Sequence, residues 1–201
     1  MKAIMLTIRL KWFYLTYKGI KTIEVRKSAP KDFVGDVYEV VSKTNFEKDL
    51  MEIPENEREF FKQFKGKVGL KFTLNKVEEI YFENHKSIYC DDPLYPETDS
   101  LSYDELLDKS CTKALPYGET EIGNYIGEKG YAWHISNLVI FDRPRELGEF
   151  KHNEEHKSCL ECPYYNVCET TDYIEVRKGI CYIPVPLTKA PQSYMFIEVK
   201  E

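Results

Sequence analysis

Four polar side chains with complementary chemistry lie within six residues near the N-terminus: Lys21, Thr22, Glu24 and Arg26. A carboxylate accepts hydrogen bonds from the exocyclic amines of a base. An ammonium or guanidinium group donates to carbonyls, ring nitrogens and phosphate oxygens. Together these groups can bind a base edge and a phosphate. A lysine and a glutamate in one cleft can also act as base and acid, provided that their surroundings separate their pKa values.

A strand over residues 22–26 would position this set. Side chains alternate between the two faces of a strand, so Ile23 and Val25 would point toward a core. The polar residues would line the other face about 6.5–7 Å apart, with Lys21 at the entrance of the strand. The alternative is an ordinary solvent-facing strand on which Glu24 pairs with neighbouring lysine or arginine side chains.

Aromatic and amide side chains elsewhere in the chain are candidates to complete such a site. Trp12 and Trp133 offer rings on which a base gains about 1–3 kcal/mol by stacking, although Trp12, on a short aromatic helix, also fits a core. His134 follows Trp133 on an expected strand, so the two face opposite ways, and we expect His134 to be paired locally. Gln192 and Ser193 occupy a turn after a proline, where they either read a base edge or cap the sheet.

Six apolar or alternating runs have the composition of strands. The chain contains 15 tyrosines and 11 phenylalanines, residue types that pack well on a half-buried pleated surface. Alternation of apolar and polar residues, or a short continuous apolar run, indicates a strand. The runs cover residues 3–8, 22–26, 36–41, 68–74, 132–141 and 194–199.

Short helices are expected between these strands. Residues 10–18 are rich in aromatic side chains and end at Gly19, a residue type that commonly follows a helix. A second helix is expected over residues 47–64 with an interruption at Pro54. Residues 102–105 have the spacing of a capping box that begins another helix. The fold class is therefore α+β, with a small barrel or strongly curled sheet and short flanking helices.

The chain of 201 residues, 42% of them hydrophobic, fits one domain with a packed core. We expect a single domain over residues 1–201 with two insertions, one of loops and a helix over about 85–128 and one rich in cysteine over about 151–182. No apolar stretch approaches the ~18–20 residues that span a bilayer. The apolar N-terminus is broken by Arg9 and Lys11 without a following cleavage site, so we expect a cytoplasmic protein that does not bind membranes.

Charge is distributed unevenly along the chain. The formal net charge is −6, yet residues 1–31 carry eight lysine and arginine side chains and one acidic side chain, Glu24. A protein that grips duplex DNA along a broad face needs many phosphate contacts, which an acidic chain does not favour. A basic N-terminal patch on an acidic body instead indicates a local anion site.

Four cysteines near the second insertion have the spacing of a metal site: Cys159, Cys162, Cys168 and Cys181. In an intracellular chain, cysteines indicate thiols or metal before disulfides. Structural Zn²⁺ is the first expectation, with His152 or His156 able to replace one sulfur. An iron–sulfur cluster and a metal-free segment remain alternatives. Cys90 and Cys111 are isolated and are expected to be free or buried.

The run from Gly19 to Arg26 has the pattern Gly-x-Lys-x-x-Glu-x-Arg, and segments at residues 131–144 and 190–194 follow it in order. Together these segments resemble the ASCH family, in members that carry an insertion. The resemblance covers about half of the chain. It implies a PUA-like fold, a curled mixed β-barrel with flanking helices, whose cleft binds RNA or nucleotides.

The resemblance also implies an enzymatic alternative. Some relatives are acetylcytidine amidohydrolases and others are reported as ribonucleases. In the amidohydrolases a threonine at the position of Glu24 is the proposed nucleophile, and a carboxylate cannot serve as the same hydroxyl nucleophile. Lys21 carries over as a base, provided that a dry pocket lowers its pKa. The first hypothesis is thus an RNA- or nucleotide-binding module, and the alternative is a hydrolase of a modified nucleoside or RNA that uses Lys21 and Glu24. Nothing in the sequence favours a third class, a regulator that binds another protein.

Overall fold

The computed structural model describes residues 1–83, 87–89, 105, 108–109, 129–156 and 181–199. Most of the two expected insertions therefore lies outside the described residues. The capping-box residue Ser102 also lies outside them, as do five cysteines: Cys90, Cys111, Cys159, Cys162 and Cys168. The sixth, Cys181, is the first residue of a strand.

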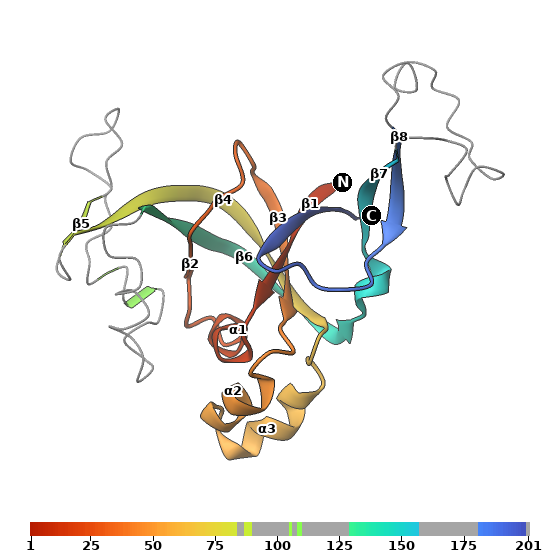
Figure 1. The fold of residues 1–201 in the computed structure, drawn as a ribbon. Helices are drawn as coiled ribbons and strands as arrows, with labels where there is room; N and C mark the ends of the chain where they lie inside the picture. Colours follow the sequence, from red (N-terminus) through yellow and green to blue (C-terminus); the bar gives the residue numbers. More distant parts are fainter. Residues whose placement is uncertain (84–86, 90–104, 106–107, 110–128, 157–180, 200–201) are drawn as a thin grey trace.

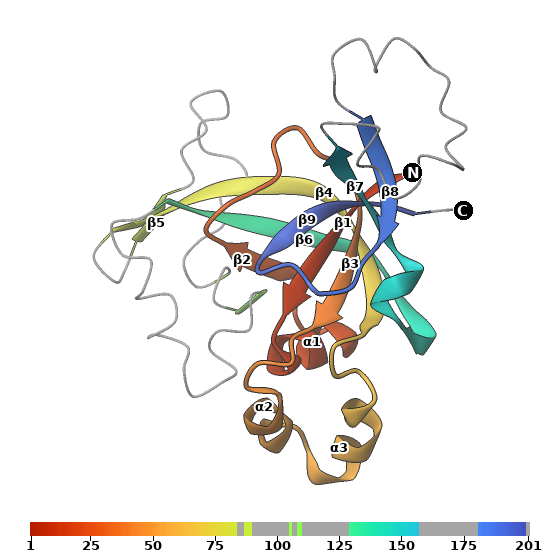
Figure 2. The ribbon, with the colours of Figure 1, turned by 45° about the vertical axis from the view of Figure 1, so that its right-hand side comes forward.

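One mixed sheet runs through the described residues (Figures 1 and 2). Its strands are β1 (Lys2–Ile8), β2 (Ile23–Arg26), β3 (Gly35–Val41), β4 (Val68–Glu83), β5 (Ser87–Tyr89), β6 (Lys129–Arg145), β7 (Lys151–His156), β8 (Cys181–Pro186) and β9 (Tyr194–Glu198). The strand order is β2-β6-β4-β3-β1-β9-β7-β8, and β5 pairs with β4. Strands β1 and β3 are parallel, and the other pairings among these strands are antiparallel.

The predicted α+β class is confirmed, whereas the predicted closure into a barrel is wrong. The sheet begins at β2 and ends at β8, and the two ends do not pair. Register shifts between β4 and β6, for example between Leu74 and Val77, accompany the curvature of these long strands. Strand β2 approaches β1 through a side chain, because Arg26 Nη2 donates to the Thr7 carbonyl at 2.8 Å. This side-chain contact joins β2 to β1, which is itself paired with β3 and β9.

Three short α-helices lie on one side of the sheet (Figure 1): α1 (Leu10–Tyr17), α2 (Phe46–Glu52) and α3 (Glu55–Lys62). The predicted first helix and the predicted break at Pro54 are both confirmed. Pro54 precedes α3 with φ of −50° and ψ of 135°, outside the helical region, since it cannot donate a backbone hydrogen bond within a continuous helix. None of the described helices is long and apolar enough to cross a membrane.

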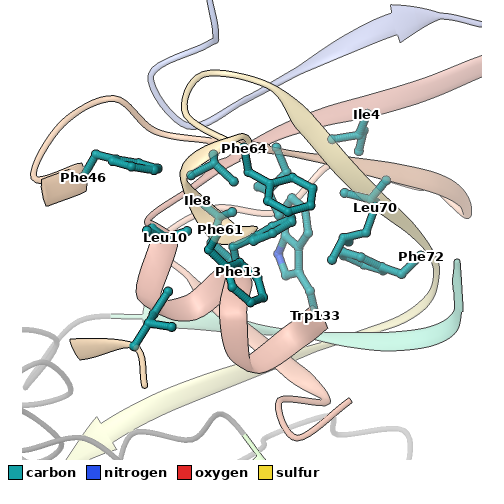
Figure 3. Close-up of a cluster of buried hydrophobic side chains, with 14 of the residues drawn as sticks. Ile4, Ile8, Leu10, Phe13, Phe46, Phe61, Phe64, Leu70, Phe72 and Trp133 are labelled. Atoms are coloured by element: carbon teal, nitrogen blue, oxygen red, sulfur yellow. The ribbon is translucent and has the colours of Figure 1, made fainter. Parts of the chain in front are cut away.

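The main core lies on the face of the sheet that these helices cover, here called the helix-side face. Figure 3 shows Phe13, Phe61 and Phe64 packed over Leu70, Phe72 and Trp133. A smaller core on the opposite face contains Tyr38, Val40 and Phe150. Alternation along β3 divides its side chains between the two cores, so that Val37 and Val41 face the helices.

A 3₁₀ turn, Leu147–Glu149, follows β6, and Arg145 pairs there with Glu149. The Glu149 pKa is lowered, chiefly because its carboxylate accepts the Glu146 backbone N–H. This turn lies away from the polar residues after Gly19 and belongs to the packing of the smaller core, through Leu147.

Candidate functional site

The end of helix α1 sets the position of Lys21. Gly19 adopts a left-handed conformation with φ of 68°, which residues with side chains rarely adopt. The backbone N–H groups of Ile20 and Lys21 then both donate to the Leu15 carbonyl, at 3.0 and 3.1 Å. This pattern closes the helix and turns the chain back toward the sheet. Lys21 therefore lies in the short connection between the end of α1 and the start of β2.

Strand β2 places its charged residues inside the molecule. Glu24 lies opposite Trp133 of β6, and directly paired residues share one face of a sheet. Trp133 belongs to the helix-side core, so Glu24 points to the same interior face. The residues Lys21 and Glu24 are 4% and 6% exposed, and Ile23, on the other face, is 1% exposed. The alternative is therefore wrong about a solvent-facing strand, but its expectation that Glu24 pairs with neighbouring lysine or arginine side chains is confirmed.

Glu24 holds two cations together. Its Oε2 lies 3.3 Å from Lys21 Nζ, and its Oε1 lies 2.8 Å from Arg26 Nε, in an ion pair without the alignment of a hydrogen bond. Lys21 Nζ also donates to the Ile23 carbonyl at 2.6 Å. We call Lys21, Glu24 and Arg26 the β2 triad. Because burial removes water from these charges, each depends on its partners for stabilisation.

Arg26 links the β2 triad to the turn before β9. Its guanidinium donates to the Thr7 carbonyl, and Thr7 donates from Oγ1 to Pro191 O at 2.6 Å and from its backbone N–H to Ser193 O at 2.9 Å. The side chain of Arg26 is 18% exposed, which makes it the outermost member of the triad. Two predicted site residues, Arg26 and Ser193, are therefore both bonded to the backbone of Thr7.

The predicted aromatic residues flank the triad. Trp133 is fully buried, with its ring centroid 5.2 Å from that of Tyr194 on β9. The Lys21 ammonium lies 5.2 Å from the centroid of the half-buried Trp12 ring. Trp12 also packs against the helix-side core, so it contributes to the core and to the triad alike.

Two predicted site residues remain outside this cluster. Thr22 is exposed and lies just before the first residue of β2, Ile23. Gln192 is exposed at the turn before β9. Its neighbour Ser193 is half-buried and reaches the cluster through its backbone.

Sequence reasoning missed Glu39, which lies on β3 between Val37 and Val41 and shares their helix-side face. Glu39 is fully buried, and neither of its carboxyl oxygens has a hydrogen-bond partner among the described residues. Burial raises its pKa well above the ordinary value, and Glu24 raises it further, while Lys21 and Arg26 oppose the shift. The carboxyl therefore favours the neutral form. An acid inside the apolar run of residues 37–41 was the signal that could have revealed it.

Trp133 carries a second unpaired polar group. Within the described part of the chain, its indole Nε1 is buried without a hydrogen-bond partner. A buried donor or acceptor left unpaired costs about 1–3 kcal/mol, and native structures contain few of them. Besides Arg26 Nε, which is ion-paired with Glu24, the interior at the β2 triad thus contains an unpaired donor on Trp133 and an unpaired carboxyl on Glu39.

The other predicted chemistry lies elsewhere or outside the described residues. His134 Nε2 lies 2.6 Å from Glu78 Oε2, on the face opposite to Trp133, so the histidine is paired locally. The described residues contain no cluster of three or more His, Cys, Asp or Glu side chains able to hold a metal. Zinc or an iron–sulfur cluster at Cys159, Cys162, Cys168 and Cys181 stays a prediction, because three of these cysteines lie outside the described residues.

Comparison with protein-family models gives no match for the chain, and comparison with curated proteins gives no significant match. The geometry of the β2 triad and the two unpaired groups beside it therefore carry the functional argument.

Proposed function

We propose that this chain is a PUA-like module of the ASCH type that binds RNA or a nucleotide at the β2 triad. The observation that carries the proposal is the buried arrangement of Lys21, Glu24 and Arg26, with Arg26 at its outer end. A buried ion cluster is a poor way to stabilise a fold, since apolar side chains of similar volume often do as well or better. Such a cluster fits a site that needs charge for binding.

The roles of the side chains follow from their positions. Arg26 is the outermost cation and is suited to a phosphate, to which a guanidinium donates two parallel hydrogen bonds. Glu24 is suited to the exocyclic amine of a base, and Glu39 and Trp133 supply a further carboxyl and an N–H donor deeper inside. Recognition of unstacked bases by polar groups and aromatic rings is the usual mode for single-stranded RNA.

The three segments that resemble the ASCH family also meet in space, which supports the family proposal. Glu24 pairs across strands with Trp133 of the second segment. Arg26 is joined through Thr7 to Ser193 of the third segment. About a hundred residues separate the first motif from the second, and about 45 separate the second from the third, yet all three connect to one cluster.

Arg26→Met is expected to weaken binding of a fluorescein-labelled single-stranded RNA by about 10- to 150-fold. The variant removes charge-assisted hydrogen bonds, each worth about 1.5–3 kcal/mol, and keeps most of the side-chain volume. Fluorescence anisotropy measures the affinity. The logarithm of the affinity should fall with the logarithm of salt concentration with a slope of only about −1 to −2, as for a pocket that contacts few phosphates.

Arg143→Met is the matched control, because Arg143 is an exposed arginine on β6. It should bind within about twofold of wild type. Arg26→Lys keeps the positive charge and replaces Arg26→Met in the binding test if Arg26→Met does not fold. Thermal melting curves show whether each variant is folded. Equal affinities for the Arg26 variants and the Arg143 variant would contradict the proposed site.

A hydrolase is the second candidate, favoured by one contact. Lys21 Nζ lies 3.3 Å from Glu24 Oε2 in a nearly dry environment, where proton transfer between positioned groups is effective. Incubation with modified nucleosides and labelled RNA, followed by mass analysis, would reveal turnover. Turnover that persists in the variant Lys21→Ala with Glu24→Ala would remove these residues from catalysis, and binding without turnover would favour the binding module.

A further inference from the structure

Strand β9 carries two aromatic side chains on the helix-side face, next to the β2 triad. Tyr194 pairs with Leu6 and Phe196 pairs with Ile4, and both partners belong to the helix-side core. Directly paired residues share a face, so the two rings project on the same side, at positions two residues apart. Such positions are about 6.5–7 Å apart along a strand.

The two rings continue outward from the buried part of the site. Trp133, fully buried, contacts Tyr194 at a centroid distance of 5.2 Å. Tyr194 is half-buried, and Phe196, one step further along, is 38% exposed although it lies on a core-facing side of the strand. Phe33, from the segment between β2 and β3, contacts the Phe196 ring edge-to-face at 5.5 Å. The aromatic surface therefore runs from the interior to the solvent.

Positive charge accompanies this surface at both ends. Lys2 Nζ lies 3.9 Å from the centroid of the Phe196 ring, and Lys2 is exposed. At the other end, Arg26 is joined through Thr7 to Ser193, the residue before Tyr194. A cation beside the Phe196 ring, with a second cation connected to the residue before Tyr194, suits a base with its phosphates better than an apolar peptide, which would gain nothing from Lys2 or Arg26.

We propose that Tyr194 and Phe196 form a stacking track for the nucleotide next to the one held at the β2 triad. The protein would then bind single-stranded RNA of two or more nucleotides more tightly than a mononucleotide. This inference rests on the proposed function and extends it from a single base to a strand. Sheet-borne aromatic rings stack successive unpaired bases in other RNA-binding folds, and each stacked base contributes about 1–3 kcal/mol.

The test compares a fluorescein-labelled hexauridylate with UMP, for wild type and for Phe196→Leu. Leucine keeps an apolar side chain but removes the π-face. We expect Phe196→Leu to weaken hexauridylate binding by about 5- to 150-fold and to leave UMP binding within about twofold of wild type. Phe196→Trp should restore hexauridylate binding, which a merely structural role for the phenylalanine would not predict.

Phe60→Leu is the matched control, because Phe60 is an exposed phenylalanine on α3, away from β9. It should bind hexauridylate as wild type does. If Phe196→Leu binds hexauridylate with wild-type affinity and still binds UMP, the stacking track is refuted and the proposed function still stands. A wild-type protein that binds hexauridylate no more tightly than UMP also overturns the track. The absence of any binding to either probe overturns the track and the proposed function together.

Discussion

Glu24→Ala is expected to lower the free energy of unfolding by about 3–5 kcal/mol. Removal of one partner from a buried ion pair leaves an uncompensated charge in a medium that solvates it poorly. Here removal of the Glu24 carboxylate leaves two cations, Lys21 and Arg26, without their anionic partner. Lys21 is almost fully buried and carries most of the effect, whereas Arg26 is partly exposed and retains its bond to Thr7. Urea unfolding followed by circular dichroism measures the change.

An exposed ion pair provides the matched control. Lys18 and Glu57 lie 2.7 Å apart with both side chains substantially exposed, so Glu57→Ala should cost less than about 1 kcal/mol. The double variant Lys21→Met with Glu24→Leu removes both charges and should recover much of the stability lost in Glu24→Ala. The burial of the triad would be refuted if Glu24→Ala cost no more than Glu57→Ala.

Glu39→Gln is expected to become more stable relative to wild type as pH rises from about 5 to 7. Below its ordinary pKa of 4.5, Glu39 is protonated in both folded and unfolded chains. Above that pH the unfolded chain releases the proton, while the folded chain keeps it because burial raises the pKa. Wild-type stability therefore falls by about 1.4 kcal/mol per pH unit until the folded pKa is reached. Glutamine has no titratable proton, so the Glu39→Gln variant does not undergo this fall in stability.

The measurement is the difference in unfolding free energy between Glu39→Gln and wild type at several pH values, in which contributions from independent groups cancel. The difference should grow in favour of the variant with rising pH. Glu59→Gln, at an exposed position on α3, should follow wild type throughout. A difference between Glu39→Gln and wild type that stays constant with pH would mean that Glu39 is ionised in the folded protein.

Local patterns were enough to predict most of the framework. Alternating or continuous apolar runs predicted β1, β3 and β9, the aromatic run before Gly19 predicted α1, and Pro54 marked the break between α2 and α3. These features depend on near neighbours in the chain. The full lengths of β4 and β6 were missed because polar residues such as Lys76 and Glu78 interrupt the apolar pattern beyond Leu74, and pairing between the two strands maintains them.

The site was predicted only in part, because its assembly depends on distant contacts. The motif identified Lys21, Glu24 and Arg26, but their burial follows from the curl of the sheet, which brings β2 to Thr7 of β1. Glu39 was missed since its apolar neighbours are typical of a core strand, and only the fold places it beside the triad. The open sheet was also beyond local patterns, because whether the end strands β2 and β8 pair depends on the whole sheet.

The central claim is that a nucleotide binds where β2, β6 and β9 meet. Titration of hexauridylate into ¹⁵N-labelled protein tests it most directly, because the chain has two tryptophans and hence two indole N–H signals. We predict that the largest shifts fall on the Trp133 indole and on the backbone amides of Glu24, Arg26 and Tyr194, with the Trp133 signal moving as its unpaired N–H gains an acceptor. Shifts concentrated instead on α2 and α3, with the Trp133 indole unchanged at saturation, would contradict the claim.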